Sequence, residues 1–235
     1  QYADYLKSDE YGAGSRGIPV SDANIRALAD HFDQIPDSIG NNGINSILID
    51  VQIDTSNTLV ENMNIWMEGV RLYTSDYYGT FNVRVETSSA TVWNINELDL
   101  IDYPEYDSGE FTERLNQLTY TVKQLVADPS EAGKLIEVDV EATFPEDGST
   151  IHTDWLAEDG GIPNFDSEQL SYTTVLEQAY YWAMVDSRIS RQPRTLDIKV
   201  NEKGWLSEVG DVIEFSSDLM GMSDYKWRID EVAED

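Results

Sequence analysis

The stretch TVLEQAYYWAMVDSRISRQP, residues 174–193, predicts the best-defined helix of this chain. Its apolar side chains recur three and four positions apart, as they do on the buried side of an amphipathic helix. They are Val175, Ala179, Trp182, Ala183 and Ile189. Pro193 cannot continue a helix, so the element ends before it. We therefore expect one long helix over about residues 174–190, with Trp182 and Ala183 on its buried side.

Alternating apolar residues predict strands on both sides of this helix. The expected strands lie at 118–126, 135–144, 196–200, 212–215 and 225–229. The first two are expected to pair through the connection at 128–133, and the Gly210-Asp211 turn leads into the fourth. Residues 147–166 are predicted to form a loop. We expect residues 111–235 to form a β-barrel-like domain, a mainly antiparallel barrel or sandwich with the one long helix.

The first hundred residues carry more helix signals. Expected N-caps are Ser21 for one helix and Ser56 or Asn57 for a second. Their apolar sides consist of Ile25, Leu28, Ala29 and Phe32, and of Leu59, Val60, Met63, Trp66 and Met67. A turn-rich stretch at 36–45, a strand at 47–53 and a hairpin of residues 70–73 and 81–85 complete this part. We expect an α+β domain over residues 1–100, followed by an acidic boundary or long connection at 96–110, and hence an α+β fold class overall.

The charge balance excludes several classes of function. The 235 residues include 45 acidic and 15 basic ones, a net charge of -30. Such a surface repels nucleic acid and anionic membrane surfaces, so specific nucleic-acid binding is not expected. No apolar run approaches the length needed to span a bilayer, so stable membrane insertion by this segment is not expected either. The absence of cysteine excludes disulfides and thiolate sites, and it fits synthesis in a reducing cytoplasm. Two interpretations of the charge stay open: a solubility coat and a more specific role.

The sequence holds no recognisable catalytic motif. It lacks the GxSxG elbow, the P-loop and the HExxH helix, so we predict no catalytic, cofactor-binding or metal-binding residue. His31 and His152 lie far apart and are expected to be surface or capping residues. The acidic stretch 97–110 could bind a cation, but it lacks the ligand pattern of an EF-hand loop, so a solvated connection is favoured. A core role is favoured over a sugar-binding platform for Trp66, Trp182, Trp205 and Trp227.

Several stretches, taken in order, resemble the tail tip attachment proteins, the J-type central hub or baseplate hub of long-tailed bacteriophages. The stretches are Tyr5 to Gly14 with Ile18 and the helix from Ser21, residues 42–67 with the hairpin Tyr77-Tyr78-Gly79-Thr80-Phe81, Leu176 to Arg194, and Leu206 to Ile213 with the closing strand from Tyr225 to Val232. The chain departs from this family at Asp128 to Lys134, which looks like an insertion, and in its extreme acidity. The sequence starts at Gln1 without methionine, so a segment of a longer or processed protein is expected.

The resemblance implies a virion structural protein that is made in the host cytoplasm. It implies a homotrimer that closes the tail tube and contacts tail tube, tape measure and distal tail proteins. Host attachment and genome passage would be the roles of the full-length protein, and no catalytic residue or cofactor is implied. The alternative from the residues alone is a secreted or surface carbohydrate-binding or glycoside-hydrolase domain. An aromatic-lined cleft with converging carboxylates would favour that alternative, whereas an uncovered apolar flank would favour the virion protein.

Overall fold

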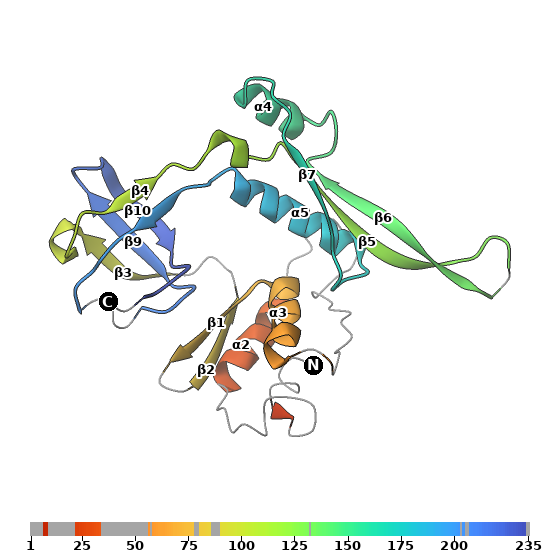
Figure 1. Ribbon diagram of the computed structural model, residues 1–235, viewed down its shortest axis with the longest axis horizontal. Coiled ribbons are helices and arrows are strands. Elements are labelled where there is room, and N and C mark those ends of the chain that lie inside the picture. Colours follow the sequence, from red (N-terminus) through yellow and green to blue (C-terminus); the bar gives the residue numbers. More distant parts are fainter. Residues whose placement is uncertain are drawn as a thin grey trace. The chain divides into compact units, whose positions relative to one another are not determined.

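The computed structural model describes most of the chain and divides it into two compact units (Figure 1). The described residues are 7–8, 22–33, 56, 58–77, 80–85, 90–131, 133–202, 204 and 207–233. The first unit takes in 1–31, 54–107 and 196–235, and the second takes in 32–53 and 108–195. Both combine helices with small sheets, which confirms the predicted α+β class.

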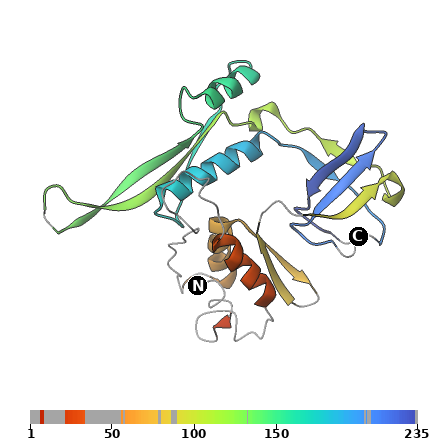
Figure 2. The same ribbon diagram turned by 180° about the vertical axis from the view of Figure 1, so that it is seen from behind.

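The second unit is built on a long antiparallel hairpin. Strand β5 (Gln117–Ala127) pairs with β6 (Leu135–Phe144), from Leu118 opposite Phe144 to Ala127 opposite Leu135. Strand β7 (Phe165–Gln169) runs parallel to β5 on its other side, and helix α5 (Leu176–Ser190) packs on β5 and β6 (Figure 2). The predicted strand pair and the predicted long helix are therefore confirmed.

The core of this unit lies between the hairpin and α5. Alternate residues of a strand face the same side, so every second residue of β5 and β6 faces the helix. The buried apolar residues are Leu118, Tyr120, Val122, Ala142 and Phe144 from the strands and Ala179, Trp182 and Ala183 from α5. Trp182 is only 5% exposed, which confirms its predicted core position.

The segment predicted as a loop at 147–166 contains regular structure. Helix α4 (Thr150–Glu158) begins after Ser149, whose hydroxyl accepts a hydrogen bond from the His152 backbone N–H at 3.2 Å. β7 follows it. The loop prediction was wrong: α4 has only nine residues and none of them is fully buried, so its apolar periodicity is weak.

The first unit contains a helix-and-hairpin part. It consists of α2 (Asp22–Asp33), α3 (Leu59–Val70) and the antiparallel strands β1 (Leu72–Tyr77) and β2 (Thr80–Val85). Thr58, one residue beyond the predicted caps, caps α3: its hydroxyl accepts from the Glu61 N–H, and the Glu61 carboxylate accepts from the Thr58 N–H at 2.6 Å. Ser21, the stretch 36–45, the strand 47–53 and Trp205 lie outside the described residues.

The rest of the first unit is a three-stranded sheet with a short two-stranded sheet. Strands β3 (Thr91–Asn96), β9 (Val212–Ser217) and β10 (Met222–Arg228) pair in the order β10-β9-β3, and β3 is parallel to β9. Strand β4 (Glu105–Asp107) pairs with β8 (Thr195–Asp197). The 3-10 helices η3 (Glu97–Asp99) and η4 (Phe111–Glu113) precede and follow β4. The two predicted C-terminal strands are confirmed, whereas the strand predicted at 196–200 is shorter and continues only as a bridge from Val200 to Leu100.

An ion pair joins the two parts of the first unit. The Arg84 guanidinium on β2 contacts the carboxylate of Asp211, and its Nη2 lies 3.0 Å from Glu208 Oε2. Asp211 directly precedes β9 and is buried. The hairpin is therefore tied to the start of the central strand of the sheet.

No closed β-barrel is found among the described residues. They form four small, open sheets, because β9 and β10 pair with β3 and not with the β5–β6 hairpin. The predicted sequence domains 1–100 and 111–235 stay a prediction. The compact units of the structure draw residues from both.

Candidate functional site

His152 stabilises the start of a helix. Its Nδ1 accepts a hydrogen bond from the Gly148 backbone N–H at 3.1 Å and lies 3.3 Å from Asp147 Oδ1. Both partners belong to the turn that precedes α4, so these contacts fix local backbone geometry. His31 lies in α2, and its side chain is outside the described part of the structure.

Two carboxylates of the acidic stretch 97–110, those of Glu97 and Asp99, accept hydrogen bonds from the protein's own backbone. Glu97 accepts hydrogen bonds from the Leu219 N–H at 3.0 Å and the Ser217 hydroxyl at 2.6 Å. These bonds hold the pKa of Glu97 below its ordinary value. Asp99 accepts from the Asn96 N–H at 3.1 Å. Where the structure describes side chains, no three acidic or histidine residues come together as metal ligands.

Two of the four tryptophans proposed for either a core or a sugar platform lie in cores. Trp182 belongs to the core beneath α5, and Trp227 packs on the cluster of Ile95, Ile213 and Phe215. The buried Trp182 cannot offer an open face to a sugar ring, and Trp227 is partly buried. The side chain of Trp66 and all of Trp205 are outside the described residues.

A buried ion pair joins the end of α4 to the end of α5 in the second unit. The Arg191 guanidinium, just after α5, lies 2.7 Å from Asp159 Oδ2 and donates a second hydrogen bond to Asp159 Oδ1 at 3.2 Å. The Asp159 side chain is 2% exposed, and that of Arg191 is 10% exposed. Arg191 also contacts Glu158 at 2.8 Å and lies over the Trp155 ring at 4.8 Å from its centroid.

Asn116 connects this ion pair to the start of β5. Its amide donates to the Asp159 carboxylate, and its Oδ1 accepts from the Asn164 N–H at 2.6 Å. The network thus joins the entrance of β5, the end of α4 and the end of α5. Its side chains are matched to one another, so the arrangement is a structural one. Sequence reasoning missed it because Asp159 and Arg191 stand 32 residues apart, with no local pattern to connect them.

An uncovered apolar surface lies at η3 in the first unit. Leu98 is 92% exposed, Ile101 is 72% exposed and Tyr103 is 82% exposed. Leu219, 77% exposed, is held beside them through its hydrogen bond to Glu97. The loop is fixed by backbone hydrogen bonds from Ile101 to Lys199 and from Asn201 to Asp99, so these side chains are presented by an ordered backbone. An exposed apolar group of this size is typical of an interaction surface.

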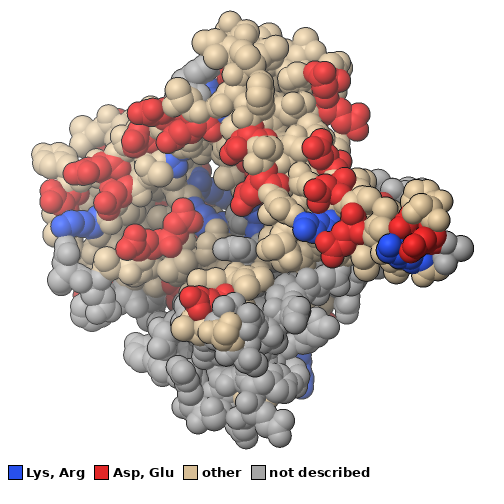
Figure 3. Space-filling model, turned by 45° about the vertical axis from the view of Figure 1, so that its right-hand side comes forward, with Lys and Arg blue, Asp and Glu red and all other residues tan. Residues whose placement is uncertain are grey.

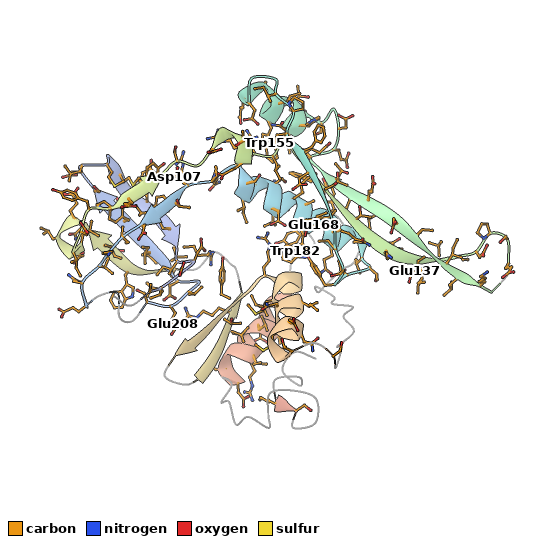
Figure 4. All side chains as sticks on the ribbon, viewed as in Figure 1. Asp107, Glu137, Trp155, Glu168, Trp182 and Glu208 are labelled. Carbon is orange, nitrogen blue, oxygen red and sulfur yellow. The ribbon has the colours of Figure 1, made fainter. Side chains whose placement is uncertain are left out.

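A second uncovered apolar surface is the far part of the β5–β6 hairpin, residues 123–138, which we call the arm. β7 pairs with β5 only as far as Thr121, so the arm has two strands (Figures 1 and 2). Leu125 on β5 is 65% exposed and Leu135 on β6 is 59% exposed. Glu137 lies on the same ribbon (Figure 4).

Among charged groups, the described surface is dominated by acidic side chains. Acidic groups are spread across the face seen in Figure 3, and lysine and arginine are few there. None of the described helices is long and apolar enough to cross a membrane. Two features of the described residues stand out: two exposed apolar surfaces, and a buried ion-pair network in the second unit.

Comparison with known proteins yields similarities of fold. No family model and no curated protein matches the sequence. The fold is similar to that of a chain in the virion of a native gene transfer agent particle, with a TM-score of 0.53 and 15% identity over 77% of this chain. The 43 kDa tail protein of prophage MuSo2 from Shewanella oneidensis gives a TM-score of 0.45 with 13% identity over 75% of this chain. The matches span 37% and 50% of the length of those two chains. The fold of this chain is therefore similar to that of part of a chain in a gene transfer agent virion.

Proposed function

We propose that this chain is a non-enzymatic structural part of a bacteriophage or gene transfer agent tail, within the central hub that closes the tail tube. The observation that carries the proposal is the similarity of fold, over 77% of this chain, to a chain of a gene transfer agent virion. The hub position within the particle is supported by the ordered resemblance of the sequence to tail tip hub proteins.

The surface chemistry supports an assembled protein. A chain that acts alone in solution gains nothing from leucines and a tyrosine that are more than half exposed on an ordered backbone. In a tail, such surfaces are covered by neighbouring proteins. The partners in this proposal are further copies of the chain, as a homotrimer, and the tail tube, tape measure and distal tail proteins. Host attachment and genome passage belong to the full-length hub.

Labelling of intact particles tests the proposal. Antibodies against this chain, applied to tailed particles from the organism that encodes it, should bind at one end of the tail. Particles labelled on the capsid or along the whole tube, or not labelled at all after mild opening of the tail tip, would contradict a hub position. The purified chain should not hydrolyse peptidoglycan, polysaccharide or peptide, and turnover that is lost on changing one carboxylate to its amide would contradict the non-enzymatic role.

A further inference from the structure

We propose that the arm, residues 123–138, is a contact through which two copies of this chain associate. The inference deepens the proposed function and rests on it for the expectation that several copies meet. The partner is a second copy of this chain, which packs on the exposed apolar side of the arm.

The arm leaves two leucines exposed on one face, and its other face carries half-buried apolar side chains. On one face, Leu125 and Leu135 are diagonal neighbours, since Leu125 is opposite Glu137 and Ala127 is opposite Leu135. On the other face, Val126 is directly opposite Ile136. α5 covers the base of the hairpin, where Gln124 donates to the Thr174 carbonyl at 3.2 Å. A two-stranded ribbon is marginal in water without a covering layer, so this ribbon is suited to being covered by a partner.

The charge of the arm identifies the partner. The arm contains two lysines and three acidic residues, a net charge of -1 in a chain of -30. All five are paired within the arm: Lys123 with Glu137 at 3.7 Å, and Lys134 with Asp128 at 3.8 Å and with Glu131 at 3.1 Å. The arm is therefore a nearly neutral, internally compensated segment of a strongly acidic protein.

Two strongly acidic copies can associate only where their surfaces do not repel each other. The arm meets this condition. A basic partner would be attracted only weakly to the arm, because each carboxylate of the arm already lies next to a lysine of the arm. Such a partner would instead be attracted to Asp139 and Glu141, exposed on β6 just below the arm. The pairing of charges within the arm thus favours a second copy over an oppositely charged protein.

Sedimentation of the whole chain over a concentration series tests the proposal, with a matched pair of double variants. Leu125→Gln with Leu135→Gln removes apolar surface from the arm without changing charge. Ile162→Gln with Ile189→Gln removes two exposed isoleucines that lie outside both uncovered apolar surfaces. We expect the wild type to self-associate, the arm variant to associate at least about tenfold more weakly, and the control to match the wild type. Circular dichroism and a melting curve check that each variant is folded.

A second variant tests the charge argument. Lys134→Gln leaves Asp128 and Glu131 without their cation, so the arm gains net negative charge. Its association should be weaker than that of the wild type at low salt and should approach it as salt rises. The proposal is overturned if the wild type stays monomeric, if the arm variant associates like the wild type, or if the isoleucine control is weakened equally. Particle labelling at the tail tip is independent of all three results, so a failure here leaves the proposed function standing.

Discussion

A substitution at Gly109 tests how tightly the chain is held where η4 begins and α5 has ended. Gly109 has φ +70°, and a Cβ added to it would lie 1.9 Å from the Pro193 carbonyl oxygen and 2.6 Å from the Pro193 Cβ. Ordinary contacts of a Cβ begin at 3.4 Å, so Gly109→Ala forces one of the two segments to move by more than an ångström. Gly148 offers a matched control in the same unit, because it has φ +71° and nothing within 4 Å of an added Cβ.

The two alanine variants separate the cost of the backbone conformation from the cost of the clash. An L residue in the left-handed region costs about 1–2 kcal/mol, and this applies equally to both positions. Overpacking adds about 1–3 kcal/mol, and this applies only to Gly109→Ala. We therefore expect Gly148→Ala to lower the free energy of unfolding by about 1–2 kcal/mol and Gly109→Ala by about 2–5 kcal/mol, measured by urea titration of the second-unit transition. Equal losses for the two variants would refute the close approach of Gly109 to Pro193.

Four further predictions follow from buried or charged groups. Trp182→Ala should cost about 3–5 kcal/mol of unfolding free energy, and a cost under about 1 kcal/mol would place the ring on the surface. Arg191→Met should lower the free energy of unfolding by about 3–5 kcal/mol, because it leaves the buried Asp159 carboxylate without its cation. Lys123→Met, at the exposed pair with Glu137, should lower it by under about 1 kcal/mol in the same titration. Because Leu219 and Ser217 lower the pKa of Glu97, its ionised form stabilises the fold above the ordinary pKa of 4.5, and this stabilisation is lost as pH falls through the lower folded value. Glu97→Gln should therefore flatten that part of an acid unfolding curve, and an unchanged curve would count against the two hydrogen bonds. Self-association should strengthen as salt rises and the Debye length shrinks from about 30 Å at 0.01 M to about 8 Å at 0.15 M, and sedimentation that shows weaker association with added salt would falsify this.

Local periodicity predicted the elements that bury one face. α5 and the β5–β6 pair have alternating or helical apolar patterns because one side of each enters the same core. β3 also carries such a signal, since Trp93 and Ile95 face the core of the first unit, and this alternation could have been found from the sequence. The strand was missed even though its pattern was present.

Other elements have no signal of this kind. All five residues of β7 are exposed, so its place beside β5 comes from backbone pairing and leaves no trace in side-chain hydropathy. The parallel pairing of β3 with β9 joins Thr91 to Val212 across more than a hundred residues. Because β9 pairs with β3, it does not join the β5–β6 hairpin, and the described strands form small open sheets where a barrel was predicted. Likewise, the network of Asn116, Asp159 and Arg191 depends on three segments that meet only after folding.

The negative charge has two interpretations: a solubility coat and, in the proposed hub, a lining of the channel through which DNA passes. Different carboxylates bear on each. Part of the charge is structural: Glu97, Asp99, Asp159 and Asp211 accept hydrogen bonds or ion pairs within their own unit. These groups cannot serve equally as a solubility coat or as the lining of a channel, because their oxygens are already engaged. The hypothesis that acidic side chains keep passing DNA from adhering therefore concerns only the exposed set, such as Asp139 and Glu141 on β6. A trimer structure decides between the two: exposed carboxylates gathered around the three-fold axis favour a lining, whereas a neutral or basic channel wall leaves only the coat.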